Sequence, residues 1–327
     1  MRLVSLACSN TEIVTALGCG HLLMGVDDHS DWPEEVVASL PRVGPDLDVD
    51  VEKVRALEPD LVLATLTVPG HEAVVERLEA AGLPYIAPEP TCLEDVYGSI
   101  EDIARRLGVP DRGEALVADM RAELDVDGPA AAGAPTLLVE WWPKPVITPG
   151  RRSWTTDVIR AAGGRATLAD EPVKSRPVSD EEVRELAPDA FVLSWCGVDP
   201  AKYRPDVIYG KELWQDLPAL RQRRVYCVPE AYLGRPGPRL VEGVRALRTI
   251  VRELRRLAPR DARILPTQSG LHVTLVTPGV PDDDVLVARA AEKDLLLSTL
   301  RRTYQFSEGQ PGIIVGFGAV TTEIGRA

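Results

Sequence analysis

The stretch VRELAPDAFVLSW, Val183–Trp195, nearly repeats VRALEPDLVLATL, Val54–Leu66, at a spacing of 129 residues. In each copy a helical pattern ends at a proline, whose ring cannot extend the hydrogen-bond ladder, and a short apolar run typical of a buried strand follows. A second echo pairs YIAPE (Tyr85–Glu89) with YCVPE (Tyr226–Glu230). The chain is therefore predicted to contain two similar α/β lobes.

Short apolar runs alternate with helical patterns along both halves, which predicts parallel sheets covered by helices on both faces. Strands are expected at 3–7, 61–64, 84–87, 136–142, 190–195 and 225–228. Helices are expected at 11–18, with Ser9 and Asn10 as capping candidates, and at 72–81, 93–107, 155–162 and 238–257.

Between the two halves, Leu116, Met120 and Leu124 form an apolar stripe on a predicted helix at 111–126, which DGPAAAGAP at 127–135 breaks. We expect a first lobe at 1–109, a connecting helix and linker at 110–134, and a second lobe at 135–258. The fold class is α/β, with two lobes joined by one long helix and a small α+β appendage at 259–327.

Composition narrows the class of partner. The chain has 327 residues and carries 37 basic and 50 acidic residues, a net charge of −13, which argues against nucleic acid and anionic membranes. The five cysteines are scattered and are expected to be reduced thiols. No secretion signal is visible in MRLVSLAC, and no apolar run of about 18 residues predicts a transmembrane helix.

Ligands of open parallel sheets bind where the strands end, and two lobes form a crevice between them. The expected crevice residues directly follow predicted strands. They are Ser9, Asn10, Asp28 to Trp32, Thr65 to Thr67, Trp141, Trp142, Ser194 to Gly197 and Glu230 to Pro236.

The chemistry of these positions favours binding over catalysis, since the sequence lacks the common nucleophile, phosphate-loop, dinucleotide and zinc-protease motifs. Trp141, Trp142 and Trp195 lie after strands, and Trp154 opens a helix, which favours a large flat ligand. The alternative is that these rings pack the cores of the lobes. Arg235, just before a helix that Pro238 can start, can contact ligand oxygens or lie on the surface.

His29 is the candidate metal contact. It lies in a predicted crevice turn beside the carboxylates of Asp27, Asp28 and Asp31. Cys196 lies on the opposite side of the crevice and is a weaker candidate.

Several motifs resemble the vitamin B12-binding members of the solute-binding proteins that serve ABC importers. They are SLACSNTEIVTALG, GVDDHSDWP, EKVRALEPDLVLA and EAYLGRPGPRLVEGV, within residues 2–257. The resemblance implies a corrinoid such as cobalamin held edge-on between the lobes, with no other cofactor required. The wider class also carries haem, ferric siderophores and metal ions.

The crevice positions and the resemblance together give the expected site residues. Expected ligand contacts are His29, Trp32, Thr65, Leu66, Trp141, Trp142, Trp154, Trp195, Tyr232 and Arg235. Thr65 or Leu66 stands where relatives carry an aromatic residue, and Ser175 where a relative has a tryptophan. Glu72 and Glu181 would dock arginines of an ABC permease. The family works outside the cytoplasm, so the missing signal indicates either a trimmed or misassigned start or a protein that binds its ligand inside the cell.

The tail, SGLHVTLVTPGVPDDDVLVARAAEKDLLL with QPGIIVGFGAVTTEIGRA, resembles the end of the small domain of aminotransferase-like regulators. It predicts strands at 272–276 and 312–317, a helix at 282–292, no transaminase activity and a role in self-association. Beside the leading hypothesis of a corrinoid-binding protein, two alternatives stay open: a chelatase or corrinoid-modifying enzyme that uses His29, and a cytoplasmic ligand sensor.

Overall fold

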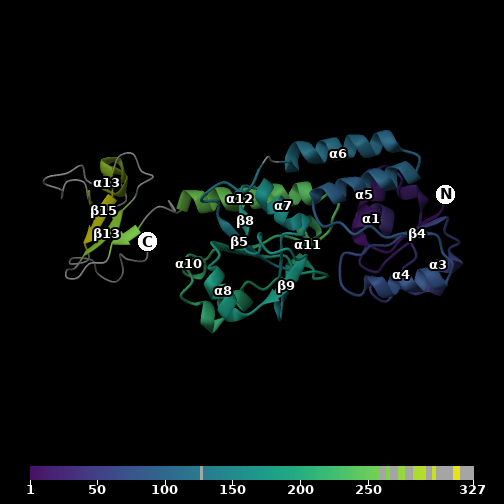
Figure 1. The fold of residues 1–327 in the computed structure, drawn as a ribbon, viewed down its shortest axis with the longest axis horizontal. Helices are drawn as coiled ribbons and strands as arrows, with labels where there is room; N and C mark the ends of the chain where they lie inside the picture. The colour runs from purple at the N-terminus through teal and green to yellow at the C-terminus, as the bar shows by residue number, and fades with distance from the viewer. Residues whose placement is uncertain are drawn as a thin grey trace. The chain divides into compact units, whose positions relative to one another are not determined.

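The computed structural model describes residues 1–125, 128–257, 263–265, 272–276, 283–291, 297–299 and 312–316. The chain forms two compact units, Met1–Val251 and Arg252–Ala327. The first unit contains both predicted lobes and the helix between them (Figure 1).

The first lobe is a parallel four-stranded sheet with helices on both faces. Its strands are β1 (Leu3–Ser5), β2 (Leu23–Val26), β3 (Leu61–Leu63) and β4 (Tyr85–Ile86), in the order β2-β1-β3-β4. Its helices are α1 (Cys8–Ala16), the 3-10 turn η1 (Gly20–Leu22), α2 (Glu34–Val37), α3 (Val51–Ala56), α4 (His71–Ala80) and α5 (Leu93–Arg106).

The alternation of strand side chains assigns these helices to faces. Val4 of β1 and Val62 of β3 enter one buried apolar cluster with Val54 of α3 and with Val74 and Leu78 of α4. Helices α3 and α4 therefore cover one face of the sheet, and α1 and α5 cover the other (Figure 1).

Helix α1 begins earlier than predicted, and the prediction that Ser9 and Asn10 cap it is wrong. The N-cap position is Ala7, which makes no side-chain capping bond. Asn10 lies inside the helix, where its Nδ2 donates to the carbonyl oxygens of Leu63, at 3.2 Å, and Ala64, at 2.8 Å. Asn10 therefore ties α1 to the end of β3 and is a buried structural residue.

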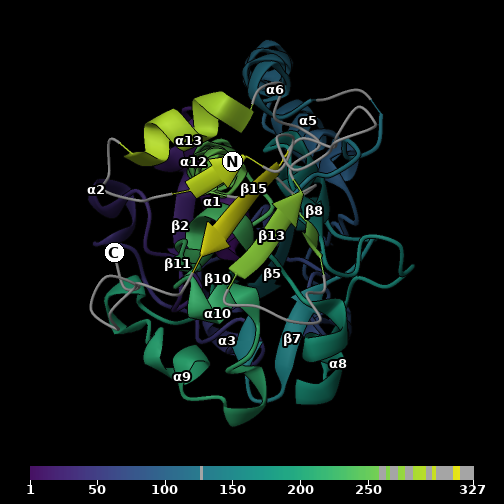
Figure 2. The same cartoon turned by 90° about the vertical axis from the view of Figure 1, so that its left-hand side faces the viewer.

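The second lobe has the same topology. Its strands are β5 (Thr136–Glu140), β8 (Arg165–Ala166), β10 (Ala190–Leu193) and β11 (Val225–Cys227), in the order β11-β10-β5-β8. All neighbours are parallel. Figure 2 labels these four strands. Read from β8, this order matches the first lobe strand for strand, so the two-lobe prediction is confirmed.

The helices of the second lobe are again on both faces of the sheet. They are α7 (Trp154–Ala161), α8 (Asp180–Leu186), η2 (Pro200–Lys202), α9 (Asp206–Tyr209), η3 (Glu212–Trp214), α10 (Pro218–Arg221), α11 (Glu230–Leu233) and α12 (Leu240–Leu257).

The repeated stretch that opens the sequence forms the same structure twice. Helix α3 with strand β3, and helix α8 with strand β10, are the two copies. Glu58 and Ala187, which precede the two matching prolines, both adopt left-handed backbone with φ of 47° and 40°. This conformation is unfavourable for residues other than glycine, and it lets each chain turn sharply from helix into strand.

A small antiparallel sheet extends the second lobe and was not predicted. It comprises β6 (Trp142–Pro143), β7 (Val146–Pro149) and β9 (Ser175–Val178), in the order β6-β7-β9. Its strands lie between segments of the parallel sheet in the chain, and each is too short for an alternating pattern to reveal it.

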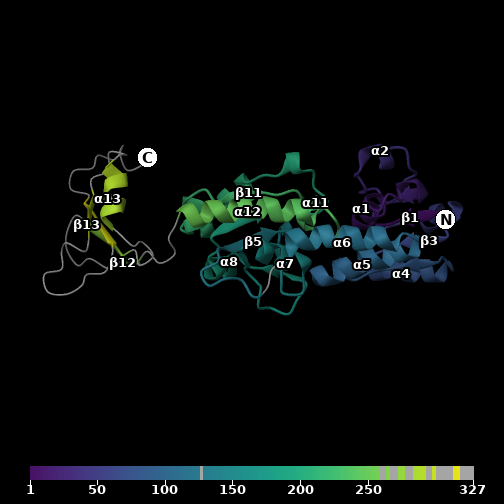
Figure 3. The ribbon, with the colours of Figure 1, turned by 90° about the horizontal axis from the view of Figure 1, so that it is seen from above.

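Helix α6 (Pro110–Leu124) connects the lobes and packs beside α5 (Figures 1 and 3). Its buried residues are Gly113, Val117, Met120 and Leu124, whereas Leu116 of the predicted stripe is only half-buried, because helical neighbours alternate in steps of three and four. A Cβ atom at Gly113 would lie 2.5 Å from the Cβ of Ala104, so the missing side chain permits this close approach.

The second unit contains an antiparallel sheet and one helix among its described residues. The elements are β12 (Arg263–Leu265), β13 (His272–Val276), α13 (Asp283–Ala291), β14 (Leu297–Thr299) and β15 (Gly312–Gly316), with strand order β12-β13-β15-β14. The predicted α+β character is confirmed for these elements. The other residues of the tail lie outside the described residues. The predicted role of the tail in self-association therefore stays a prediction. Within the described ranges no helix combines the length and apolar character that crossing a bilayer requires.

Candidate functional site

A hollow of about 370 Å³ lies between the two lobes of the first unit. Its residues follow the carboxyl ends of parallel strands, as expected for this topology. His29 and Asp31 follow β2, Gly197 to Pro200 follow β10, and Pro229 to Tyr232 follow β11; Arg235 and Arg239 complete the wall. We call this hollow the cleft.

Arg235 is the central residue of the cleft, with its side chain only 11% exposed. Its Nη1 donates to Glu12 Oε1 at 2.9 Å and to Asp31 Oδ1 at 2.5 Å, and its Nη2 donates to Asp31 Oδ2 at 3.2 Å. Its Nε donates to Glu230 Oε2 at 3.1 Å. Glu12 and Asp31 belong to the first lobe and Glu230 to the second, so one guanidinium ties the lobes together.

The three carboxyl groups around Arg235 differ in environment. Burial raises the pKa values of Glu12 and Glu230, although Arg235 opposes this effect. Burial also acts to raise the pKa of Asp31, but the hydrogen bonds and charge of Arg235 outweigh it and lower that pKa. The Asp31 side chain is 63% exposed, against 2% for Glu12. Asp31 is therefore the most solvent-exposed of the three carboxyl groups.

Arg239 joins the aromatic part of the cleft. Its Nη1 donates to Glu12 Oε1 at 3.2 Å. The guanidinium carbon lies 5.0 Å from the ring centre of Trp32 and 4.9 Å from that of Tyr232, within range for cation–π attraction. Trp32 and Tyr232, predicted contacts from opposite lobes, are thus brought to the same place.

A buried aspartate holds the turn that carries His29 and Asp31. Asp27 accepts hydrogen bonds from Ser30 Oγ at 2.5 Å and from the His29 backbone N–H at 3.0 Å. Burial raises its pKa, and these two hydrogen bonds act in the opposite direction. Ser30 Oγ also lies 2.8 Å from Thr11 Oγ1 of α1, so the turn is anchored to the first lobe.

His29 faces a second aspartate, Asp46, with 3.8 Å between His29 Nε2 and Asp46 Oδ1. The other oxygen of Asp46 lies 3.4 Å from Nε2 of the buried His71. Throughout the described ranges, no three histidine, cysteine, aspartate or glutamate side chains converge in a way that could hold a metal ion. A metal contact by His29 therefore stays a prediction, and it requires a metal that the ligand itself brings.

The tryptophans of the second lobe lie mostly inside it. Trp154 and Trp195 are 5% and 6% exposed. The Nε1 of Trp154 donates to the Leu233 carbonyl and that of Trp195 to Glu140 Oε1, both at 2.8 Å. Trp141 stacks on Trp154 with 6.2 Å between ring centres. Their rings pack the lobe, which was the alternative interpretation of the sequence, and none lines the cleft.

Trp142, at 44% exposure on β6, is open to solvent but is also not among the cleft residues. Thr65 and Leu66 lie at another contact between the lobes. Lys174 of the second lobe reaches across, with its Nζ 3.3 Å from the Leu66 carbonyl oxygen and 2.6 Å from Glu89 Oε1. The lobes are therefore joined by charge pairs at two separate places.

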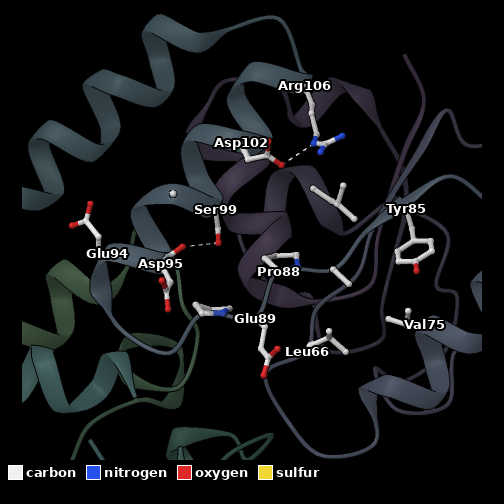
Figure 4. Close-up of a pocket in the computed structure, with 14 residues that line it drawn as sticks. Leu66, Val75, Tyr85, Pro88, Glu89, Glu94, Asp95, Ser99, Asp102 and Arg106 are labelled. Atoms are coloured by element: carbon white, nitrogen blue, oxygen red, sulfur yellow. Dashed lines mark hydrogen bonds and ion pairs between the residues drawn. The ribbon is translucent and has the colours of Figure 1, made fainter. Parts of the chain in front are cut away.

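A larger hollow of about 750 Å³ lies within the first lobe, between α5 and the outer strand β4 (Figure 4). Figure 4 shows Leu66 and Tyr85 on one side and Asp102, paired with Arg106, on the other. The second lobe contributes no residue to it. Because the cleft joins both lobes at the strand ends, we take the cleft as the candidate site.

The predicted docking glutamates are both exposed at helix N-termini. Glu72 Oε2 accepts from the Gly70 backbone N–H at 2.9 Å at the start of α4. Glu181 is the second residue of α8 and borders a surface hollow with Arg184 and Asp216. Helix α8 is the repeat partner of α3, so the two glutamates do not occupy equivalent helices. Their docking role stays a prediction.

Glu12 and Arg239 are cleft residues that the sequence interpretation missed. Glu12 lies in α1, where a charged residue among apolar ones gave a weak signal of a buried ion pair. Arg239 ends the RPGPR stretch that Arg235 begins, in the non-helical segment between α11 and α12.

Comparisons with known proteins agree with this architecture. A family model described as periplasmic binding protein matches residues 3–232. The chain is 32% identical over 254 residues to an uncharacterised ABC transporter substrate-binding lipoprotein, YvrC, of Bacillus subtilis (strain 168), covering 75% of this chain and 78% of the relative.

Two further similarities concern proteins whose names state a ligand. The chain is 29% identical over 249 residues to a vitamin B12-binding protein of Vibrio parahaemolyticus serotype O3:K6, covering 74% of this chain and 86% of that protein. The periplasmic haem-binding protein RhuT of Roseiflexus sp. RS-1, solved in apo form, superposes with a TM-score of 0.64 at 28% identity and covers 77% of this chain and 98% of its own. These comparisons do not support the resemblance of residues 259–327 to aminotransferase-like regulators.

Proposed function

Since the chain belongs to the periplasmic binding protein family, we propose that it binds a corrinoid such as cobalamin in the cleft and presents it to an ABC importer. The observation that carries this proposal is the composition of the cleft wall. Tyr232, Arg239 and His29 line the wall. Beside the wall, Trp32 of the first lobe contacts the same Arg239 guanidinium that lies over Tyr232. Aromatic surfaces with a few fixed polar groups suit a large ring with a polar edge.

The relatives support this ligand class. The Vibrio parahaemolyticus relative is named for vitamin B12 and the Roseiflexus protein for haem, and both ligands are metal-containing macrocycles. The cleft, at about 370 Å³, is smaller than a whole corrinoid. The ligand would therefore enter edge-on, with part of the ring projecting from the cleft or with the lobes moving apart.

Titration of the purified full chain with cyanocobalamin, followed by calorimetry and visible absorption, tests the proposal. We expect saturable binding, weakened about tenfold or more in Trp32→Ala and in Tyr232→Ala, because buried aromatic contacts dominate such interfaces. Leu213→Ala, an exposed apolar residue at 43% that lies outside the cleft, is the matched control. Absence of binding at high micromolar ligand would reject the proposal.

The proposal describes a carrier and involves no chemical turnover. Ligand recovered from the complex by denaturation should be the compound that was added, as checked by mass spectrometry. A modified corrin or an altered metal content, formed in more than one equivalent per protein, would instead favour the alternative of a corrinoid-modifying enzyme.

Delivery to a permease would use the exposed glutamates. We propose that Glu72 and Glu181 pair with permease arginines, because both carboxylates are exposed at the helix surface. Glu72→Arg and Glu181→Arg should leave cyanocobalamin affinity unchanged and abolish stimulation of the permease ATPase in vesicles. Glu76→Arg, an exposed residue on α4, is the control and should keep the stimulation.

A further inference from the structure

The cleft is lined by more carboxyl groups than guanidinium groups. Four carboxyl groups lie at or directly beneath its wall against two guanidinium groups; they are Glu12, Asp31, Asp199 and Glu230, against Arg235 and Arg239. The other ionisable side chains on the wall are His29 and Tyr232, and His29 Nε2 lies 3.8 Å from Oδ1 of a further carboxylate, Asp46. An anionic group entering the cleft would therefore face the exposed carboxylates of Asp31 and Asp199.

The donors of Arg235 are also in use. Asp31 takes Nη1 and Nη2 together, which is the bidentate geometry that a ligand carboxylate would otherwise adopt. Glu12 and Glu230 take further donors of the same guanidinium. A ligand carboxylate could gain this geometry only by displacing Asp31, and the displaced charge would remain nearby on the same turn.

An uncharged amide meets neither obstacle. Its carbonyl oxygen can accept one N–H from Arg239 or Arg235, and its N–H groups can donate to Asp31 or Glu230. Both ends of the amide then find a partner while the ion pairs of Arg235 persist.

We propose that Asp31 makes the cleft select a macrocycle edged with uncharged amides over one edged with carboxylates. This inference rests on the proposed function and names the chemistry of the ligand edge. The residue acts by occupying Arg235 and by adding an exposed negative charge to the cleft wall. One unit charge at contact distance in partly solvated surroundings changes affinity by about tenfold.

A matched pair of corrinoids tests the inference. Dicyanocobinamide and dicyanocobyrinic acid share the corrin ring and cobalt and differ in whether the edge side chains end in amides or carboxylates. We expect the wild-type chain to bind the amide form at least about tenfold more tightly near neutral pH. In Asp31→Asn the preference should shrink by about tenfold, mainly through tighter binding of the acid form.

Asp28→Asn is the matched control, since Asp28 is exposed in the same turn but does not line the cleft. An unchanged ratio in Asp31→Asn, or an equal change in Asp28→Asn, would overturn the inference. If neither corrinoid binds any of the proteins, the proposed function is wrong. The proposed selection by Asp31 is then tested with hemin, which carries two carboxylates, and with its uncharged dimethyl ester. The proposal holds if the wild-type chain binds the ester more tightly and Asp31→Asn does not, and it is wrong otherwise.

Discussion

Replacing Glu140 by glutamine should remove a large pH dependence from the stability of the first unit. Glu140 ends β5 with 0% exposure, and its Oε1 accepts from Trp195 Nε1 at 2.8 Å. Its Oε2 has no hydrogen-bond partner in the described part of the chain. Burial raises the pKa of Glu140 from 4.5 to about 7; the Trp195 bond and Lys211 act to lower it, and Asp180 to raise it.

The sign of the effect follows from proton binding. Between about pH 4.5 and pH 7 the folded protein keeps the proton on Glu140 while the unfolded chain has lost it, so the folded state is favoured at low pH. This contribution is complete below pH 4.5 and is lost as pH rises through 7. A shift of this size corresponds to about 3 kcal/mol in total, most of which is lost between pH 5 and pH 8.

The assay is thermal unfolding of the full chain, followed by tryptophan fluorescence at about pH 5 and pH 8. All six tryptophans precede residue 252, so the signal reports the first unit. Glutamine keeps the acceptor for Trp195 and cannot ionise. Relative to wild type, the Glu140→Gln protein should therefore gain about 5–10 °C in Tm between pH 5 and pH 8. The exposed Glu185→Gln is the control. Parallel pH profiles for wild type and Glu140→Gln would refute the reasoning.

Three further predictions concern the second lobe and the cleft. Trp214→Ala should cost about 3–5 kcal/mol in urea unfolding because this ring is 0% exposed, whereas the 44% exposed Trp142→Ala should change little; equal losses would contradict the packing described. Ala187→Gly should stabilise by about 0.5 kcal/mol by relieving left-handed backbone, while Ala115→Gly in exposed helix should destabilise by about 1 kcal/mol. If Ala187→Gly and Ala115→Gly both lower the free energy of unfolding, the backbone at Ala187 is not strained. Aquocobalamin should shift its visible bands on binding as His29 replaces the cobalt-bound water, and the same shift in His29→Ala would exclude that contact.

Much of the order of elements could be predicted from the sequence because it depends on local signals, but the edge strands β2 and β8 were not predicted. Helix and strand in each copy of the repeat follow from apolar spacing and from the proline between them. The start of α1 was missed because Asn10 has the composition of a cap, while its partners, Leu63 and Ala64, lie more than 50 residues away.

The location of the candidate site was predicted, but the ion pairs within it were not. Its place at the strand ends follows from topology, but the ion pairs of Arg235 join residues 223 and 204 positions apart, a proximity that one sequence does not encode locally. The inward orientation of Trp195 could have been predicted from the sequence. Phe191, Leu193 and Trp195 alternate along and beyond β10, so they share one face, and all three enter the same buried cluster.

The bare backbone of Gly113 makes the resting angle between the lobes adjustable from outside the cleft. A methyl group there would meet Ala104 at 2.5 Å and tilt α6 away from α5. Because α6 connects the two lobes, that tilt would change the distance between the lobes in the ligand-free protein. The residues that line the cleft would remain the same. A substitution at Gly113 is therefore expected to change ligand affinity without changing which side chains contact the ligand.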